Sequence, residues 1–436
     1  MHYKSMVFGT QLLEATMRKS ILTLSLAVLM GSLGANANPA EGKTRVEMGI
    51  NESNLLAADQ NRYTYKNMQE FMKTKNVDSG ANTPILLSYA EQQLGDVHFL
   101  HQGKPMTLQG MLEKHRADAF VVLKDGKIVH EQYFDGQTER TQHQMMSVTK
   151  SFTGIIAATL VAEGKLKRQV QISEYIPELK GSAFGDASVG KVMDMSNNVK
   201  YSEKYEDPNA EVFQHMKTIG FAPMENDYNG PKTIHEFLST LNKEGSRQHG
   251  EEFHYISANT DVVAWLIERV EGKPFNVVLS ERIWSKLGMD RDAFIIVDDE
   301  GTALASGGLN ATARDLAKFG QMLVSQGKNL VGEQVLPKEA IQSTQNGGDV
   351  DAFEKGGYGA KGEVFEGWSY RNQFWHTNNS NQAYTALGIF GQWIYVDPTE
   401  NVVIVRQASA PTSINDVWDG EMLSAIDAII SQLHQQ

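Results

Sequence analysis

The sequence predicts an α/β fold of the α+β type, in which helices flank an antiparallel β-sheet and an all-helical subdomain is inserted. Three observations lead to this class. Strand patterns occupy residues 118–134, a second pair of strand patterns occupies residues 391–409, and the patterns between them are mostly helical. Strands on both sides of a helical region imply a sheet whose strands come from distant parts of the chain.

The two strand regions have the features of β-hairpins. Residues 118–134 contain two β-rich runs that Asp125-Gly126 joins, and this dipeptide is typical of a tight hairpin turn. Residues 391–409 contain a second pair of runs, which turns through Pro398 to Asn401. Both hairpins are therefore expected in the predicted sheet.

The helical patterns have recognisable stop signals. Residues 146–162 form an apolar run that ends before Gly164, and residues 257–274 contain Gly272 and Pro274 as stops. Two further helical segments are residues 310–327 and 421–433. The sequence thus predicts a helix-rich region between the hairpins and a helix that closes the chain.

Residues 17–37 have the pattern of a secretory signal peptide. Arg18 and Lys19 precede an apolar run, which is followed by an A-x-A sequence at 35–37. The apolar run is shorter than the roughly 18 residues that a membrane span requires. We therefore expect translation to start at Met17, the leader to be removed, and the mature protein to reach the bacterial periplasm or the exterior.

The composition, at 41% hydrophobic and 21% charged residues, indicates a soluble globular protein. The formal net charge of −13 argues against nucleic acid as a partner. The sequence has no cysteine, which rules out disulfides and a Cys nucleophile. No later stretch is apolar and long enough to span a membrane. The expected organisation is residues 1–37 as upstream residues and signal peptide, 38–90 as an N-terminal extension, and 91–436 as one domain with a helical subdomain at about 165–310.

Ser147 and Lys150 form a Ser-x-x-Lys sequence at the start of the apolar helix. On a helix such residues share a face, and the helix N-terminus together with burial lowers a lysine pKa, so that a neutral amine can accept the serine proton. The alternative is an ordinary helix-opening serine with a solvated lysine. The same spacing occurs at Ser188/Lys191 and Ser325/Lys328, where a glycine precedes the lysine and predicts turns or helix ends.

Tyr255-Ile256-Ser257 leads directly into the helix predicted at 257–274. A tyrosine hydroxyl beside a lysine amine can be held as phenolate or can pass a proton to a leaving group. Ser257 could then bind Lys150 or a substrate carbonyl. The alternative is that Tyr255 is a core aromatic whose hydroxyl has another partner.

In this order the motifs resemble those of the serine β-lactamases and penicillin-binding proteins, in particular the class C-like branch with esterases and 6-aminohexanoate-dimer (nylon-oligomer) hydrolases. The resemblance covers about residues 118–430. It is carried by "MMSVTKSFTG", "VMDMSNNVKYSEKYEDPNAE", "FHYISANTDVVAWLIERVEG", "LASGGLNATARDLAKFGQML" and "ALGIFGQWIYVDP". It implies a beta-lactamase/transpeptidase-like fold and a serine hydrolase that needs no metal or organic cofactor.

The resemblance implies that Ser147 is the nucleophile, Lys150 the general base and Tyr255 the proton-transfer residue, with Ser257 as its neighbour. Tyr205 resembles the loop tyrosine that closes over substrate in the nylon-oligomer branch. The alternative for Tyr205 is a surface aromatic in a loop.

The resemblance also implies an oxyanion hole, which consists of the backbone N–H groups of Ser147 and Ile389. The strand that contains Gly388 would form the edge of this site.

The chain departs from the lactamase pattern at two places. Ser257 occupies a position that is Asn in lactamases, and Ala386-Leu387-Gly388 replaces a Lys-Thr-Gly or His-Thr-Gly sequence. "HTNN" at 376–379 precedes the strand and is interpreted as a loop. Because the missing Lys/Thr pair normally binds a substrate carboxylate, an ester or linear-amide hydrolase is the first hypothesis. A β-lactamase or D-Ala-D-Ala peptidase is the second, and a catalytically silent binding protein is the third.

Other constellations are weaker. "RQHGEEFH" at 247–254 lacks the His-Glu-x-x-His spacing, so no metal site is predicted. "WSYRNQFWHTNN" at 368–379 is either a hydrophobic substrate wall or a packed loop. The expected partner is a small-molecule ester or amide, while the natural substrate and the oligomeric state remain open.

Overall fold

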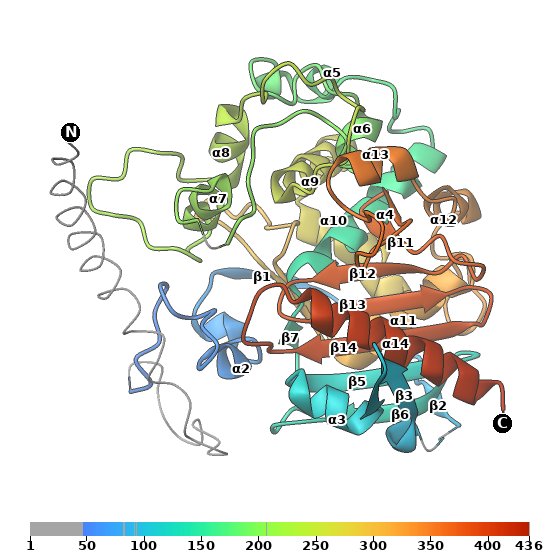
Figure 1. The fold of residues 1–436 in the computed structure, drawn as a ribbon. Coiled ribbons are helices and arrows are strands. Elements are labelled where there is room, and N and C mark those ends of the chain that lie inside the picture. The colour runs from blue at the N-terminus through green and yellow to red at the C-terminus, as the bar shows by residue number, and fades with distance from the viewer. Residues whose placement is uncertain (1–46, 82, 91, 93, 206, 436) are drawn as a thin grey trace, which may run out of the picture. The chain divides into compact units, whose positions relative to one another are not determined.

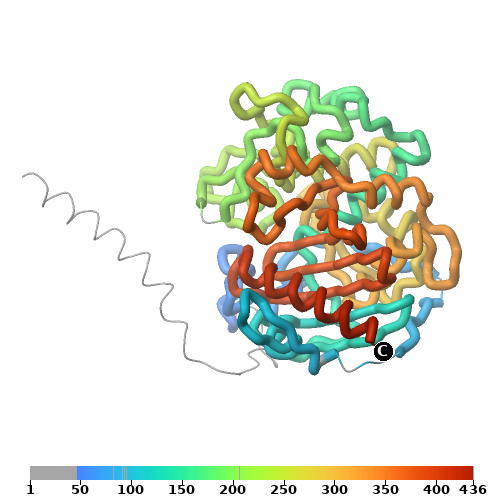
Figure 2. Tube along the Cα trace, turned by 45° about the vertical axis from the view of Figure 1, so that its right-hand side comes forward, coloured from blue at the N-terminus to red at the C-terminus, as the bar shows by residue number. Residues whose placement is uncertain are grey.

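The fold was examined in a computed structural model, which describes residues 47–81, 83–90, 92, 94–205 and 207–435. The predicted leader and the residues before it lie outside these ranges. Figure 1 shows a large sheet with helices on both faces, and in Figure 2 the green and yellow helical segments gather at one end of it. The predicted fold class is confirmed.

The main sheet has eight strands in the order β10-β11-β12-β13-β14-β5-β6-β2. Neighbouring strands are antiparallel except β2 and β6, which pair in parallel. The sheet is therefore mixed, not purely antiparallel as predicted, because a two-residue edge strand from the N-terminal part joins it. Its strands are β10 Ser369–Arg371, β11 Phe374–His376, β12 Tyr384–Gly388, β13 Gln392–Asp397, β14 Val402–Ala408, β5 Ala117–Lys124, β6 Lys127–Tyr133 and β2 Ser88–Tyr89.

Both predicted hairpins are confirmed as β5–β6 and β13–β14. Asp125 and Gly126 have φ angles of 52° and 74°, the left-handed pair that a tight turn between twisted strands requires. The two turns also contact each other, since Asp125 N donates to Asn401 O at 3.0 Å. Asn401 Nδ2 donates to Asp125 Oδ1 at 2.8 Å.

Two smaller sheets were not predicted. The first has the order β1-β8-β9-β7, and the second is the β3–β4 hairpin. Their strands have two to four residues each, too short for a recognisable alternation of apolar and polar residues. The strands are β1 Thr74–Val77, β3 His98–His101, β4 Lys104–Thr107, β7 His143–Gln144, β8 Ala293–Ile296 and β9 Leu309–Ala311.

The predicted helices are present, and the first of them begins as the 3₁₀ turn η3 Met146–Val148. Gly272, with φ 67°, ends α9 in the left-handed conformation that glycine favours. The α-helices are α2 Asn61–Thr64, α3 Leu108–Lys114, α4 Thr149–Ala162, α5 Ile172–Tyr175, α6 Val189–Met193, α7 Glu211–Thr218, α8 Ile234–Thr240, α9 Ser257–Glu271, α10 Phe275–Arg282, α11 Ala313–Val324, α12 Lys338–Gln345, α13 Val350–Lys355 and α14 Asp416–Leu433.

Helices cover both faces of the main sheet. In Figure 1, α14 crosses the front of the sheet and α11 lies behind it. On the α14 side, apolar residues of α3 and α14 pack on Phe120, Trp393 and Ile404 in one core. On the other side α11 approaches the strands closely, because a Cβ on Gly320 would lie 2.4 Å from Val403 Cγ1.

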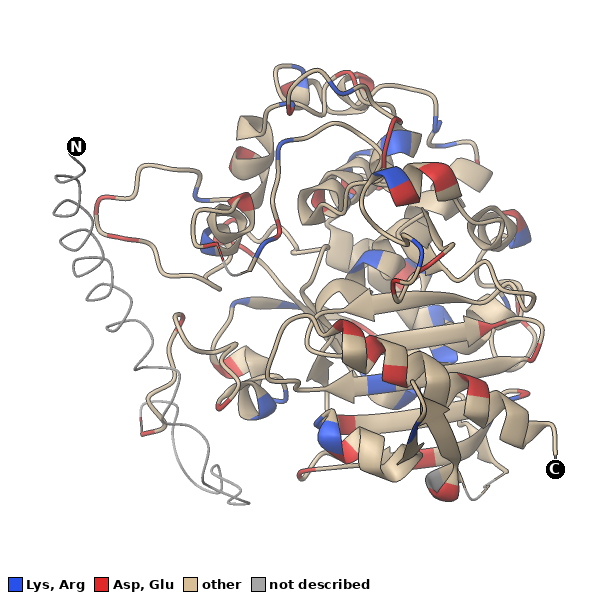
Figure 3. Cartoon of the chain, viewed as in Figure 1, with Lys and Arg blue, Asp and Glu red and all other residues tan. Residues whose placement is uncertain are grey.

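Charged residues of both signs are distributed over the chain, with Lys and Arg interspersed among Asp and Glu (Figure 3). Among the described residues, none of the helices combines the length and the hydropathy needed to cross a bilayer.

An ion-pair network joins α2 to the main sheet. Asp118 on β5 is fully buried, with Arg62 Nε 3.1 Å and Lys66 Nζ 3.5 Å from Oδ1, and His143 Nε2 3.2 Å from Oδ2. Burial alone would raise the pKa of Asp118, but the hydrogen bond with His143 and the charges of Lys66 and Arg62 lower it to about 2. The ionised carboxylate therefore holds the N-terminal segment on the sheet.

This network predicts a pH-dependent contribution to stability. Because the folded-state pKa of Asp118 is below its unfolded value, its contribution is present above about pH 4 and is lost as the pH falls toward 2. Asp118→Asn should lower the free energy of unfolding at pH 7 by on the order of 2 kcal/mol. The difference from wild type should shrink between about pH 4 and pH 2, as measured by urea denaturation.

Asp135→Asn is the matched control. Asp135 pairs with the same Arg62 and Lys66, but its side chain is 34% exposed, so a loss under about 1 kcal/mol is expected. A pH-independent loss in Asp118→Asn would contradict the prediction.

Candidate active site

Ser147 lies where the main sheet meets the first long helix. It is in the middle of η3, one turn before α4, and the preceding Met146 has φ 48°. A left-handed conformation is rare for a non-glycine residue and persists only where the surroundings impose it. The strand end at Gly388 supplies part of these surroundings, since a Cβ there would lie 2.7 Å from Met145 O and 3.1 Å from Ser147 N.

Lys150 follows on the first turn of α4 and is 1% exposed. Its Nζ donates to Ser147 Oγ at 2.8 Å and to Ser306 O at 2.6 Å. Burial lowers the pKa of Lys150 to about 8, while the charges of Glu203 and Asp261 act in the opposite direction. A substantial fraction of the amine is therefore neutral slightly above pH 7, next to the Ser147 hydroxyl.

Tyr255 lies beside this pair. Its ring centroid is 5.1 Å from Lys150 Nζ, within the range of a cation–π contact. Burial and the charge of Glu203 raise the pKa of Tyr255 well above its usual value, and a hydrogen bond with Ser147 lowers it. The phenol is thus neutral at ordinary pH, the form that can donate a proton, and is not the phenolate that the sequence also allowed.

Glu203 connects the other two predicted residues to the site. Its Oε1 accepts from Ser257 N at 2.5 Å, and its Oε2 accepts from Tyr205 Oη at 3.2 Å. Tyr205 therefore lies in the site, half-buried on the loop after α6, and not on the surface. Ser257 lies in the site as well, where its backbone N–H binds a carboxylate.

A second carboxylate lies behind Lys150. Asp261 on α9 is 2% exposed, and its Oδ1 accepts from Ser306 N at 3.0 Å. The carbonyl of Ser306 is the one that Lys150 contacts. Asp261 Oδ2 is 3.1 Å from His215 Nε2, and Tyr201 Oη is 3.1 Å from His215 Nδ1. Asp261 thus orients the Ser306 peptide toward the lysine.

A cavity of about 60 Å³ opens at the nucleophile. Ser147, Tyr201, Tyr205, His215 and Ser257 contribute polar atoms to its walls, together with Ser306 and Gly307. The other walls are apolar and consist of Met146, Val212, Met216, Ile219, Phe221, Leu304 and Ile389. Ser147 and Ile389 face the same cavity, as the predicted oxyanion hole requires.

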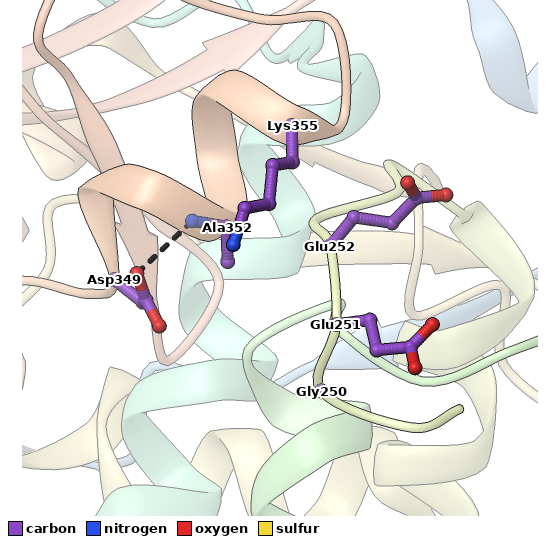
Figure 4. A pocket seen from close by; sticks show the side chains of 6 residues that line it. All are labelled: Gly250, Glu251, Glu252, Asp349, Ala352 and Lys355. Atoms are coloured by element: carbon purple, nitrogen blue, oxygen red, sulfur yellow. Dashed lines mark hydrogen bonds between the residues drawn. The ribbon is translucent and has the colours of Figure 1, made fainter. Parts of the chain in front are cut away.

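A larger surface hollow of about 520 Å³ lies elsewhere, between residues 250–252 and α13 (Figure 4). Its acidic residues have structural partners: Asp349 Oδ1 accepts from Ala352 N at 3.0 Å, Glu251 Oε2 accepts from Gln248 N at 3.0 Å, and Glu252 pairs with Arg247. Its lining contains no serine or tyrosine beside a lysine. We therefore assign the chemistry to the smaller cavity at Ser147.

The remaining motifs have structural partners. In the stretch 247–254, His249 Nδ1 accepts from Asn198 N at 2.8 Å. No group of three or more His, Asp or Glu side chains within the described ranges is arranged to hold a metal ion. Residues 368–379 form the β10–β11 hairpin and the loop after it, and Trp368, Tyr370 and Trp375 are buried in an aromatic cluster against which Tyr255 packs. Of the two interpretations of this stretch, a hydrophobic substrate wall or a packed loop, the structure therefore favours the packed loop.

Sequence reasoning missed several residues of the site. Glu203 and Asp261 lie inside quoted motifs, two residues before Tyr205 and four after Ser257, so their positions near functional residues were a signal. Tyr201 lies in the same quoted motif as Glu203, four residues before Tyr205, and had the same signal. His215 had no such signal, because its contact with Asp261 joins α7 to α9, which are far apart in the sequence.

Comparisons with known proteins show which family the sequence matches. The family model described as Beta-lactamase matches residues 107–422. The 6-aminohexanoate-dimer hydrolase of Paenarthrobacter ureafaciens is 36% identical over 329 residues, which are 74% of this chain and 82% of that protein.

Solved structures give the same result. A Bacillus anthracis protein assigned as a 6-aminohexanoate-dimer hydrolase superposes with a TM-score of 0.81 and 32% identity, over 90% of this chain and 99% of that one. EstCE1, a hydrolase with promiscuous acyltransferase activity, shares the fold at a TM-score of 0.57 and 15% identity, over 74% of this chain and 96% of that one.

The close contact at Gly388 predicts a sensitive position. Gly388→Ala would place a Cβ 2.7 Å from Met145 O, so β12 and η3 must separate. We expect a loss of about 1–3 kcal/mol in the free energy of unfolding, as for other overpacked sites, together with slower reaction of Ser147 with a fluorophosphonate.

Gly181→Ala is the control, because a Cβ at Gly181 has no other atom within 4 Å. Urea denaturation and labelling rates of the two variants provide the measurement. If Gly388→Ala were as stable as the wild type, the end of β12 would not be in close contact with Met145 and Ser147.

Proposed function

The chain belongs to the Beta-lactamase family and is a serine hydrolase of that family, and from this premise we propose that it cleaves an ester or a linear amide through an acyl-enzyme on Ser147. The observation that carries the proposal is the contact between Lys150 Nζ and Ser147 Oγ at 2.8 Å, inside a site that lowers the lysine pKa to about 8.

Acylation begins when the neutral Lys150 amine accepts the proton of Ser147, whose Oγ attacks the substrate carbonyl carbon. Negative charge then develops on the carbonyl oxygen. Ser147 and Ile389 both line the cavity, which supports their N–H groups as the donors that stabilise this oxyanion. Removal of one such donor typically slows a serine hydrolase by about 10²- to 10³-fold.

Tyr255 completes the reaction. Its neutral phenol donates a proton to the departing alkoxide or amine, and the resulting phenolate is stabilised by the adjacent Lys150 ammonium. Deacylation reverses these roles, since the Tyr255/Lys150 pair activates the water that attacks the acyl-enzyme.

The walls of the cavity indicate the substrate class. Met146, Val212, Met216, Ile219 and Leu304 suit an aliphatic chain. A relative is named 6-aminohexanoate-dimer hydrolase, and a linear amide between aliphatic units fits such walls. A penicillin-like substrate is disfavoured because Ala386-Leu387-Gly388 supplies no cation for its carboxylate. Turnover of a chromogenic cephalosporin would instead favour a penicillin-recognising enzyme over an ester or amide hydrolase.

We place the reaction outside the cytoplasm. The signal-peptide pattern of residues 17–37 and the absence of cysteine from the sequence support export. N-terminal sequencing of the protein from a bacterial periplasm tests this, and a chain that retains residues before 37 would contradict it.

The mechanism predicts that Ser147→Ala abolishes both fluorophosphonate labelling and ester hydrolysis. Peptide mass spectrometry should locate the adduct on Ser147 in the wild type. The matched control is Ser325→Ala, which removes the serine of another Ser-x-x-Lys sequence, at the end of α11, and should retain activity. A folded Ser147→Ala variant with full esterase activity would exclude the mechanism, and a folded wild type that takes no label would favour a binding protein.

The pKa of Lys150 predicts the pH dependence. The acid limb of kcat/KM should have its midpoint near pH 8, because only the neutral amine accepts the serine proton. The titratable groups that face Lys150 are Glu203, Asp261 and Tyr255. Asp261 raises the lysine pKa, so Asp261→Asn should move the acid limb to lower pH while its amide oxygen still accepts from Ser306.

Asp298→Asn serves as the control for this shift. Asp298 is equally buried, but it accepts from the backbone of Ile234, Glu300 and Thr302. Its removal should leave the midpoint in place. If the midpoint of the acid limb of kcat/KM moved to higher pH in Asp261→Asn, or did not move, this limb could not be assigned to Lys150.

A further inference from the structure

A short N-terminal segment contacts both sides of the proposed oxyanion hole. The segment, residues 61–65, consists of α2 and Tyr65, and it lies before the part of the chain that the family model matches, residues 107–422. Asn61, Thr64 and Tyr65 are fully buried. Such burial is unusual for a polar extension and indicates that the segment packs into the domain.

The first side is the chain that leads to Ser147. The carbonyl of Tyr65 accepts from Gln144 N at 2.9 Å, three residues before the nucleophile. The Tyr65 ring packs edge-on against His143, with centroids 5.7 Å apart and an interplanar angle of 84°. Tyr65 therefore fixes the strand from which η3 starts.

The second side is the turn that presents Ile389. The Tyr65 ring also contacts Phe390, with centroids 5.7 Å apart and an interplanar angle of 66°. Phe390 O accepts from Ala410 N at 3.1 Å, and the carbonyl of Ala410 accepts from Asn61 Nδ2 at 2.8 Å. The same segment thus holds Phe390, the residue after Ile389, in two ways. Tyr65 contacts its ring, and Asn61 is linked to its carbonyl through hydrogen bonds with Ala410.

The two residues next to the oxyanion donors have strained backbones. Met146, directly before Ser147, has φ 48°, and Phe390, directly after Ile389, has φ 63°. A non-glycine residue in this region is strained and relaxes unless neighbouring groups hold it. One buried side chain, Tyr65, contacts Phe390 itself and the strand that leads to Met146.

We propose that Tyr65 is a positioning residue of the active site: its ring and carbonyl hold the Ser147 and Ile389 backbones at the separation that an oxyanion requires. This proposal rests on the proposed function, because it takes these two N–H groups as the oxyanion donors. It assigns a catalytic purpose to a segment outside the family match. This role belongs to the ring and the carbonyl of Tyr65 and not to its hydroxyl.

The experiment compares Tyr65→Ala with Tyr65→Phe, using p-nitrophenyl butyrate as substrate. Tyr65→Ala should lower kcat by about 10- to 100-fold with little change in KM, because a displaced donor weakens binding of the transition state and not of the substrate. Tyr65→Phe keeps the ring and should restore wild-type kcat. Tyr63→Ala, which removes a half-buried ring from the same helix that packs on Phe71, should also have wild-type kcat.

Thermal unfolding separates this effect from loss of fold. If Tyr65→Ala does not fold, Tyr65→Leu retains apolar volume without the aromatic edge and is assayed in its place. A folded variant with kcat within about twofold of wild type would overturn the proposal, since an effect on stability alone leaves the transition state of the folded enzyme unchanged.

Amide hydrogen exchange gives a readout that does not depend on activity. Tyr65→Ala should accelerate exchange in peptides that cover 143–148 and 386–392, but not in α9. If the wild type neither hydrolyses the ester nor takes a fluorophosphonate label, the proposed function fails. The exchange data still test the positioning, and unchanged exchange in both peptides would overturn it.

Discussion

The burial of Lys150 is the interaction on which the site depends. An ammonium group inside a protein is costly unless acceptors surround it, and here Ser147 Oγ and Ser306 O are those acceptors. They are too few to keep the lysine fully charged, so its pKa falls to about 8. Glu203 and Asp261 limit this fall. The charged fraction of the Lys150 amine therefore depends on two opposing effects. Burial lowers its pKa, and the charges of Glu203 and Asp261 raise it.

This balance brings distant parts of the sequence together. α4 carries Lys150, α9 carries Asp261, the loop after α6 carries Glu203, and the turn before β9 supplies the Ser306 carbonyl. The main sheet contributes the end of β12 at Gly388, which lies next to Ser147. Each contribution comes from a different element, so the site is complete only when the sheet and the helical region have both formed. The rigid packing on both faces of the sheet keeps the contacts within hydrogen-bonding distance.

Local patterns were sufficient to predict the fold class and the two long hairpins. The juxtaposition of Tyr255 with Ser147 and Lys150 was predicted from the order of motifs that resembles the serine β-lactamases, since Tyr255 is far from the other two in the sequence. The sequence was not sufficient for β1, β2 and β7, since strands of two to four residues have too little pattern and are stabilised by partners far along the chain. Glu203 and Asp261 were overlooked for a related reason. A charged residue beside a motif is usually solvated, and only the folded structure shows that Asp261 is buried and accepts from the Ser306 peptide that Lys150 also contacts.

The pairing of β5 with β14 also sets the order in which this protein can mature. It joins residues 117–124 to residues 402–408, so the inner part of the main sheet cannot form until residues 402–408 have left the ribosome. Such long-range pairing folds slowly. Ser147 precedes β14 by more than half of the chain, and the β12–β14 strands that present Gly388 are made last. A nascent chain that has not yet reached β12–β14 thus carries Ser147 without Gly388 and Ile389 beside it, so the proposed site is incomplete at that stage.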